Sequence, residues 1–332
     1  MNLNALHFNN VYIDAYASLV GKKEFNGPLG VEFDAYENDE YFGCNSFEEA
    51  ESEMVRRNLN LLLKKANKNF DDIDLILGGD LINQCIATSY SIVDKNIPFL
   101  GLYGACSTII EATICAAAFI NINNINNAIA LASSHFCASE RQYRFPLEYG
   151  SIRTPTSQNT VTGAGAMLLS AETKRIKLAS GLIGRIVDKG VTDANNMGAA
   201  MACAAVDTIL RFFNSSSISP DKFDYIITGD LGIEGHCIAR EMLNLEGLTL
   251  GNNFVDCGAM IYDQKKQDTH SGGSGCGCIA SVLCGHFMKL LENGTAKNIL
   301  VIGTGALLNP NSVFQKRNIP GIAHAIHITT EV

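Results

Sequence analysis

The sequence contains no tryptophan, few prolines and no surplus of basic side chains. It has seven prolines in 332 residues, and 25 Lys and Arg stand against 34 Asp and Glu, for a formal net charge of −9. Sequence-independent binding of nucleic acid depends on Lys and Arg releasing counterions from phosphates. We therefore expect no nucleic-acid partner.

Long apolar runs are also missing. The longest weakly polar stretch, Ala105 to Ile120, contains Glu111 and is shorter than the roughly 20 apolar residues of a membrane-spanning helix. The first ten residues, MNLNALHFNN, show no basic segment followed by an apolar one, so no export signal is expected. These features predict an intracellular protein without a transmembrane segment, whose contact with a membrane is peripheral.

Cysteine is present in an odd number, 11, which does not suit a disulfide framework in a large chain without an export signal. Most of these thiols should be small buried hydrophobic residues. Cys276 and Cys278 form a C-x-C pair, but no second cysteine pair or histidine pair follows at zinc-site spacing. We expect neither a metal site nor a cofactor.

Two pairs of similar segments indicate an internal duplication. FDDIDLILGGDL (residues 70–81) recurs as DKFDYIITGDL (221–231) at a separation of 150, and each copy follows a segment with apolar residues at helical spacing. NAIALASS (127–134) recurs as NILVIGTG (298–305) at a separation of 171, and both read as strands buried on two faces. We expect the 21 residues of difference to lie in the first copy, around Ile82 to Phe99.

Alternating strands and helices without a Pro-rich linker predict an α/β fold of two similar halves, residues 1–170 and 171–332, around a pseudo-two-fold axis. In each half a Gly-rich turn opens an apolar helix, Thr108 to Ile120 in the first and Ile279 to Leu291 in the second. Two segments fall outside this repeat. We interpret Ala171 to Asn196 as the crossover between the halves and Gly21 to Asn45 as a long surface loop.

The clearest candidate for chemistry is Cys106. A buried strand, Pro98 to Tyr103, leads through Gly104 and Ala105 and delivers this cysteine to the first turn of a helix. Free backbone N–H groups and the helix dipole at such a position stabilise a thiolate and lower its pKa. Cys106 is then a nucleophile or a ligand contact. The alternative is a small buried residue that lets helix and strand approach.

The two halves, the helix-borne cysteine and the Gly-rich C-terminal signature resemble the thiolase and ketoacyl-synthase superfamily, which implies a duplicated, layered α/β fold. A closer resemblance is to a non-enzymatic family within it, the stage V sporulation protein AD family of endospore-forming bacteria. Its motifs span nearly the whole chain: GGDLINQ (78–84), FLGLYGACST (99–108), SSHFCASERQYRFPLEYG (133–150), TVTGAGA (160–166), NMGAAM (196–201), TGDLG (228–232), GGSGCGC (272–278), TGALLNP (304–310) and IPGIAHA (319–325).

The chain departs from the enzymes of this superfamily in the residues that assist the cysteine. Those enzymes need a His and an Asn, or a second His, to deprotonate the thiol and polarise a thioester carbonyl. The corresponding segments here read TGDLG (228–232) and Gly273-Ser274-Gly275, and Ala164 replaces an acidic residue between two glycines. His236 is the nearest substitute, although its setting reads as the start of another helix. We expect no catalysis, with a Cys106-dependent acyltransferase or condensing enzyme as the alternative.

The resemblance implies a function and a set of partners. The ligand would be dipicolinic acid, alone or as its calcium chelate, taken up into the developing spore. The chain would be the binding component of a spore channel, on the cytoplasmic face of the forespore or spore inner membrane, with other membrane subunits as partners and as a homodimer. Cys106 and Gly275, each at the opening of a helix, could offer N–H groups to the dianion.

Other candidate ligand contacts follow the strand that ends at Ser134. Ser133, Ser134 and His135 stand at the carboxyl end of this strand, where open α/β sheets place ligands, and they could donate to carboxylate oxygens. A structural role for His135 stays open.

Two arginines complete the set of candidates. Arg141 and Arg144 match carboxylates bidentately, but Glu140 and Glu148 are close enough in sequence to pair with them instead. We include Arg141 in the predicted site.

Overall fold

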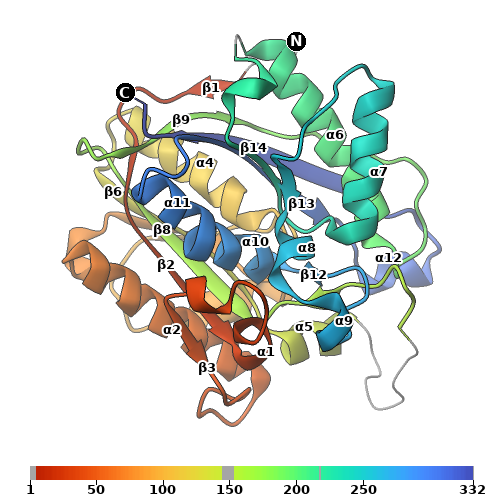
Figure 1. Ribbon diagram of the computed structural model, residues 1–332. Coiled ribbons are helices and arrows are strands. Elements are labelled where there is room, and N and C mark those ends of the chain that lie inside the picture. The colour runs from red at the N-terminus through yellow and green to blue at the C-terminus, as the bar shows by residue number, and fades with distance from the viewer. Residues whose placement is uncertain (1–4, 144–152, 217, 332) are drawn as a thin grey trace.

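The computed structural model describes residues 5–143, 153–216 and 218–331 (Figure 1). Within them, most strands join one mixed sheet of twelve strands with the order β11-β10-β13-β14-β9-β2-β8-β6-β4-β5, to which β1 and β3 add at the side. The strands of this sheet are β1 (Leu6–His7), β2 (Tyr12–Gly21), β3 (Ala35–Glu37), β4 (Leu75–Gly79), β5 (Phe99–Gly101), β6 (Asn127–Ser134), β8 (Gly163–Ser170), β9 (Ile176–Leu182), β10 (Tyr225–Thr228), β11 (Phe254–Asp256), β13 (Asn298–Ala306) and β14 (Gly321–Thr329).

The strand order is itself duplicated. From the outside inward the sheet reads β5-β4-β6-β8-β2 on one side and β11-β10-β13-β14-β9 on the other. β2 and β9 meet antiparallel at the centre, with Tyr12 opposite Lys177. Leu75 lies opposite Ala128 in the first half, and Tyr225 lies opposite Ile299 in the second. The separation from Leu75 to Tyr225 is 150 and that from Ala128 to Ile299 is 171, so the strand pairing repeats both separations found in the sequence. The predicted α/β fold of two similar halves is therefore confirmed.

Matching aspartates hold the same junction in each half. Asp74 accepts hydrogen bonds from the backbone N–H groups of Asn126 and Asn127, at 2.8 and 2.9 Å, where β6 begins. Asp224 accepts from the N–H groups of Lys297 and Asn298, at 2.6 and 2.9 Å, where β13 begins. The side chains thus fix the register of the neighbouring parallel strands in both copies.

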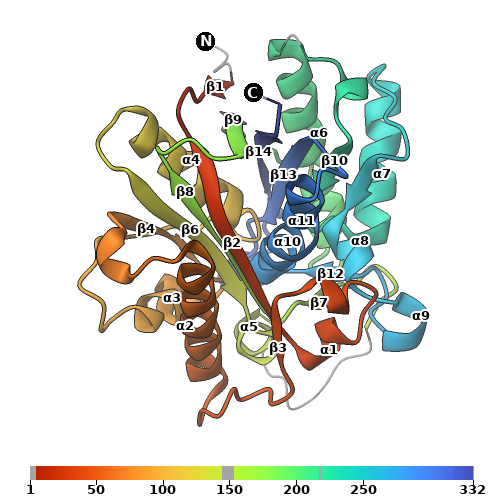
Figure 2. The ribbon, with the colours of Figure 1, turned by 60° about the vertical axis from the view of Figure 1, so that its left-hand side comes forward.

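Helices lie between and outside the two sets of strands (Figure 2). α4 and the helical run from α10 through a π-helical turn to α11 lie in the middle, α2 and α3 cover the first set, and α6 and α7 cover the second. The ranges are α2 (Phe47–Ala66), α3 (Ile86–Ser91), α4 (Thr108–Asn121), α6 (Met197–Ser215), α7 (Gly232–Leu245), α10 (Cys276–Val282), the π turn (Leu283–Phe287) and α11 (Met288–Glu292).

The burial of these helices follows from their sequences. α2 turns one apolar stripe inward, including Met54, Leu59 and Leu62, and keeps its charged residues outside except for the buried Glu51. α4 is apolar on nearly every face and is buried accordingly, as expected for a helix enclosed by strands on two sides. Among the described residues, no helix combines the length and apolarity that a bilayer crossing requires.

Three expectations about the connections were wrong. The extra residues lie in the second copy, not in the first. The separation between matching strands rises from 150 at β10 to 171 at β13, so the second copy has additional residues between these two strands. They form α8 (Cys257–Ile261), α9 (Gln264–Gln267) and β12 (Gly273–Ser274). The segment Ala171 to Asn196 is not only a crossover, since it contains β9. Gly21 to Asn45 is not a surface loop, because it contains α1 (Lys22–Phe25) and β3, which extends the sheet beside β2.

Candidate functional site

Cys106 lies where the chain leaves β5 and enters α4. The preceding residue, Ala105, has a φ of +49°, in the left-handed region that a residue with a side chain rarely adopts. The Cys106 side chain is only 7% exposed, and its Sγ lies 3.9 Å from the hydroxyl of Ser274, which belongs to β12 of the second half. Cys106 therefore lies in the turn just before α4, one residue ahead of the N-cap Ser107, and this turn presents the thiol to residues of the other half.

Asp230 is the acidic group beside Cys106. It follows β10, is fully buried, and its carboxylate accepts hydrogen bonds from the Thr304 hydroxyl at 2.7 Å, the Gly275 N–H at 3.1 Å and the Ser274 hydroxyl at 3.2 Å. The carboxyl group also contacts the Cys106 thiol. This network ties β10, β12 and β13 of the second half to the cysteine of the first.

The prediction that the helix end lowers the pKa of Cys106 was wrong. Burial raises the pKa of the Cys106 thiol well above its ordinary value, and the negative charge of Asp230 raises it further. Desolvation disfavours the charged thiolate more than the dipole of α4 favours it. The resting side chain is a neutral thiol, with burial also raising the pKa of Asp230 itself.

A cavity of about 100 Å³ opens in front of Cys106, with room for several water molecules. Most of its polar groups are hydroxyls, and the hydroxyls of Tyr103 and Tyr143 lie 2.5 Å apart. The Ser139 hydroxyl is buried and has no hydrogen-bond partner within residues 5–143, 153–216 and 218–331. The lining residues are Leu81, Tyr103, Ala105, Cys106, Ser139, Glu140, Tyr143, Thr160, Ala194, Asn195, Met197, Ser274, Ala306 and Leu308.

Three of the cavity residues, Ser139, Glu140 and Tyr143, come from α5 (Phe136–Tyr143), and a fourth, Thr160, comes from the short strand β7 (Asn159–Thr160). Glu140 accepts a hydrogen bond from the Thr160 hydroxyl at 3.1 Å and is 3% exposed. Tyr143 donates to the Leu81 carbonyl at 2.8 Å, and burial raises the pKa of Tyr143 to about 12. The cavity wall therefore consists mainly of neutral hydroxyl groups with one carboxylate.

The structure places Gly275 near Cys106, but among the described residues neither Gly275 nor Ser133 and Ser134 line the cavity, and the Gly275 N–H predicted to face the ligand is already used. Gly275 donates its N–H to Asp230, which contacts Cys106. The Ser133 hydroxyl is buried against the Glu51 carboxyl at 2.8 Å. Both serine hydroxyls are already occupied in the core, because Ser134 donates to the Val161 carbonyl and accepts from the Gly277 N–H. These serines hold the fold around the site and do not line the cavity.

His135 faces a different cavity. Its Nε2 lies 2.8 Å from the carbonyl oxygen of Glu40, and its ring stacks on Phe47 with centroids 5.5 Å apart. Burial lowers the pKa of His135, so the ring is neutral at physiological pH. This placement does not support the prediction that His135 and Cys106 contact the same ligand. The contacts of His135 instead match the structural role that the sequence left open.

Arg141 lies on the surface rather than in the cavity. Its side chain is 49% exposed and pairs with Glu48 of α2, and not with Glu140 as the sequence suggested. α5 turns Glu140 toward the cavity and the next residue away from it, because neighbouring helical residues point in different directions. Arg144 and Glu148 lie outside the described residues.

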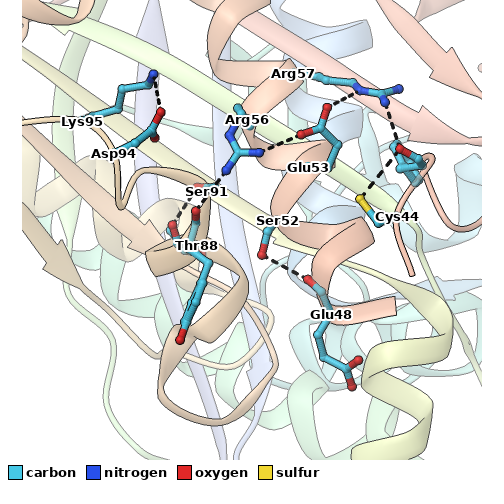
Figure 3. Close-up of polar contacts among 12 residues, drawn as sticks. Cys44, Glu48, Ser52, Glu53, Arg56, Arg57, Thr88, Ser91, Asp94 and Lys95 are labelled. Carbon is cyan, nitrogen blue, oxygen red and sulfur yellow. Dashed lines mark hydrogen bonds and ion pairs between the residues drawn. The ribbon is translucent and has the colours of Figure 1, made fainter. Parts of the chain in front are cut away.

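The surface of α2 around Glu48 is a network of paired charges (Figure 3). Arg56 pairs with Glu53 at 2.9 Å, and Arg57 pairs with Glu53 at 2.8 Å. Arg57 also donates to the Phe42 carbonyl at 2.9 Å. Among the described residues that line the hollow between α2 and α3, the one basic side chain is Arg56, and it is paired with Glu53.

No histidine lines the Cys106 cavity among the residues that the structure describes. His236 lies on α7, where its Nε2 is 3.3 Å from Arg240 and its ring packs against Phe254. Within the same residues, no group of three or more His, Cys, Asp or Glu side chains could hold a metal ion. An amide, that of Asn195, lies at the exposed rim of the cavity.

Sequence reasoning did not single out Asp230, Ser139, Tyr143 and Asn195 as site residues. A signal existed for Asp230 alone, because it matches Asp80 in the repeat and follows the strand where the enzymes carry a histidine. The other three lie on segments whose direction the sequence does not show.

Solved structures of other proteins share this fold. The chain superimposes on 3-oxoacyl-[acyl-carrier-protein] synthase III from Aquifex aeolicus VF5 with a TM-score of 0.61 and 13% identity, over 96% of this chain and 99% of that one. Cerulenin-bound OleA from Xanthomonas campestris gives a TM-score of 0.64 and 13% identity, over 97% and 98%. At this identity the likeness shows the fold alone, and that fold is thiolase-like, as the resemblance implied.

Comparison of sequences shows the family as well as the fold. The family model for stage V sporulation protein AD matches residues 4–329. Stage V sporulation protein AD of Bacillus subtilis (strain 168) is 39% identical over 316 residues, which cover 95% of this chain and 93% of that protein. Because both matches extend over nearly the whole length, the chain belongs to the stage V sporulation protein AD family.

Proposed function

We propose that this chain, a sporulation protein by its family, binds dipicolinic acid in the Cys106 cavity and releases it unchanged. The ligand enters as the free dianion or as its calcium chelate. In this proposal the chain is the binding component of the spore dipicolinate channel, a homodimer docked on membrane subunits at the cytoplasmic face of the forespore or spore inner membrane. The observation that carries the proposal is a cavity of hydroxyl donors in which Cys106 faces a carboxyl group, with no imidazole among its described lining residues.

The lining suits a flat molecule with carboxylate groups. Dipicolinic acid, pyridine-2,6-dicarboxylic acid, is planar, and aromatic rings such as those of Tyr103 and Tyr143 favour stacked or edge-on contact with another ring. Hydroxyl groups and amides can donate to carboxylate oxygens. The Ser139 hydroxyl suits this purpose because it has no hydrogen-bond partner among the residues that the structure describes.

Binding without turnover is supported by the state of the thiol. A condensing enzyme needs a thiolate and donors that polarise a thioester carbonyl. Here burial and Asp230 raise the pKa of Cys106, so the thiolate is disfavoured. Among the described residues, the polar groups that contact Cys106 are the Asp230 carboxyl and the Ser274 hydroxyl, and neither is an imidazole.

The calcium chelate suits the carboxylate on the cavity wall. The Glu140 carboxyl group lines the cavity and accepts a hydrogen bond from the Thr160 hydroxyl. In the chelate, calcium neutralises the ligand and still has room for further oxygen ligands, because it takes six to eight. Glu140 could supply one of them. We therefore expect Glu140→Gln to weaken binding of the chelate more than binding of the free acid.

Isothermal titration with dipicolinate, with and without calcium, tests the proposal. We expect Ser139→Ala to weaken binding roughly 10- to 100-fold, because a hydrogen bond to a charged group contributes about 1.5–3 kcal/mol. Ser89→Ala is the matched control, since that hydroxyl donates to the Cys85 carbonyl outside the cavity. Folded wild-type protein that releases no heat at millimolar ligand in either form would refute the proposal.

Intact-mass measurement addresses the alternative, acyl transfer through Cys106. After incubation with a panel of acyl-CoA thioesters we expect an unchanged mass. An acyl adduct that maps to Cys106 and disappears in Cys106→Ala would establish the transferase and overturn binding without turnover.

A further inference from the structure

A second cavity, of about 230 Å³, lies at the start of α5. Asn159 lines this cavity and the next residue, Thr160, lines the Cys106 cavity, so β7 separates the two. The lining residues of the second cavity are Gly21, Lys22, Lys23, Glu24, Glu37, Glu40, Phe42, His135, Phe136, Cys137, Asn159 and Thr162.

Two cations converge on one neutral oxygen, that of Asn159; Lys23 and Asn159 line this cavity, whereas Arg153 reaches Asn159 from outside the lining. The Lys23 ammonium donates to Asn159 Oδ1 at 3.1 Å, and the Arg153 guanidinium donates to the same atom at 2.9 Å. Neither cation lies within 4.0 Å of a carboxylate of the described residues. Burial and the charge of Arg153 lower the pKa of Lys23, as expected for like charges held close together.

The acidic side chains of the cavity do not neutralise this pair. Glu37 is held by Arg57 at 2.9 Å. Glu24 accepts hydrogen bonds from the Thr162 N–H and the Tyr262 hydroxyl, and burial raises its pKa, which favours the uncharged acid.

The remaining titratable groups lie at the edge of the cavity or are neutral. Glu40 is exposed at the rim and contacts His135 through its backbone carbonyl. Lys22 is exposed as well, and burial raises the pKa of the Cys137 thiol to about 11. Among the described residues, Lys23 and Arg153 therefore form no ion pair, although Glu24 and Asp268 act on Lys23 at longer range.

We propose that this second cavity binds the oxyanion group, carboxylate or phosphate, of a small molecule between Lys23 and Arg153. The pair is already oriented for this purpose. Asn159 is 1% exposed and fixes both cations, the Arg153 guanidinium lies 5.4 Å from the centre of the Phe136 ring, and the Lys23 ammonium lies 5.6 Å from that of Tyr262. A bound oxyanion would offset the repulsion between the Lys23 ammonium and the Arg153 guanidinium. It would also accept charge-assisted hydrogen bonds from both groups, and neither side chain would have to move.

Titration of the full-length protein with inorganic phosphate and with acetate, at constant ionic strength, tests this site and separates the two oxyanions. We expect saturable binding of at least one probe, weakened tenfold or more by Lys23→Met and by Arg153→Met and retained in Lys23→Arg. Lys22→Met is the matched control because that lysine is exposed and does not contact Asn159. Ser139→Ala should leave phosphate and acetate binding unchanged while it weakens dipicolinate binding, which keeps this site distinct from the Cys106 cavity.

Wild-type protein that binds neither probe saturably would overturn the proposal. Equal affinity of the wild type, Lys23→Met and Arg153→Met for the probes would overturn it too. A melting temperature of Lys23→Met no lower than that of the wild type supports the proposal, since removing one of two like charges relieves repulsion. A lowered melting temperature with unchanged probe binding would assign Lys23 a structural role instead.

Discussion

Replacing Asp230 with alanine tests the network that joins the two halves at Cys106. The carboxylate is fully buried and accepts from three donors. Ser274 borders the cavity and can turn to water, but the Thr304 hydroxyl and the Gly275 N–H would be left without an acceptor. Each buried unpaired donor costs about 1–3 kcal/mol, so we expect Asp230→Ala to lower the free energy of unfolding by about 2–6 kcal/mol.

Urea unfolding followed by circular dichroism measures this change. Asp230→Asn keeps the size of the side chain and one acceptor oxygen, so its cost should be smaller than that of alanine. Asp193→Ala serves as a control, because that exposed side chain accepts one backbone N–H, that of Asn195. A value for Asp230→Ala within about 1 kcal/mol of the wild type would contradict the reasoning.

The same substitution should change the reactivity of Cys106. Without the negative charge of Asp230 the pKa of the thiol falls, so Asp230→Asn should be alkylated by iodoacetamide at lower pH than the wild type. Peptide mass mapping measures modification at Cys106, and the exposed Cys237 is the internal reference. An unchanged or upward-shifted pH profile of Cys106 would show that Asp230 does not control the thiol.

Three further predictions concern the fold. Gly275→Ala should cost about 2–5 kcal/mol, because φ is +107° and a Cβ would lie 2.8 Å from a serine hydroxyl of β6, whereas Gly190→Ala, with φ +80° and open space, should cost about 1 kcal/mol in the same urea assay. Burial lowers the pKa of His324 to about 4, so this histidine takes up a proton near pH 6.5 in the unfolded chain but only near pH 4 in the folded chain. The free energy of unfolding should therefore fall by up to about 3 kcal/mol between pH 6.5 and pH 4. A His324→Leu variant that keeps the full pH dependence would contradict this. Asp74→Ala and Asp224→Ala should lower stability by similar amounts, about 1–2 kcal/mol each, and a difference of several kcal/mol would refute their equivalence.

Elements with a strong local pattern were predictable from the sequence. The run 127–134 is β6, the run 298–305 lies within β13, and the helix expected from Thr108 begins at that residue. Continuous apolar runs bounded by polar residues show the period and the ends of such elements without knowledge of their neighbours. The separations of 150 and 171 also carried over into strand pairing, because duplicated strands keep duplicated registers.

Predictions that required knowledge of the environment did less well. Cys106 at the opening of α4 was predicted to favour the thiolate, a conclusion that holds when only the helix dipole acts. The structure adds burial and Asp230, which come from packing and from the other half, and together they reverse the direction of the pKa shift. The segment Gly21 to Asn45 was predicted as a loop because it is rich in acidic and glycine residues. The sequence did not show that its Phe33 and Phe42 are buried.

The sequence by itself determined the duplicated strands and the cysteine at the start of a central helix, because local periodicity encodes both. Only the tertiary structure decided which polar groups meet that cysteine. Residues adjacent in sequence point in different directions, so Glu140 lines the cavity while Arg141 lies outside it. Asp230 and Ser274 reach Cys106 from more than a hundred residues away, a proximity that arises when the two halves pack together.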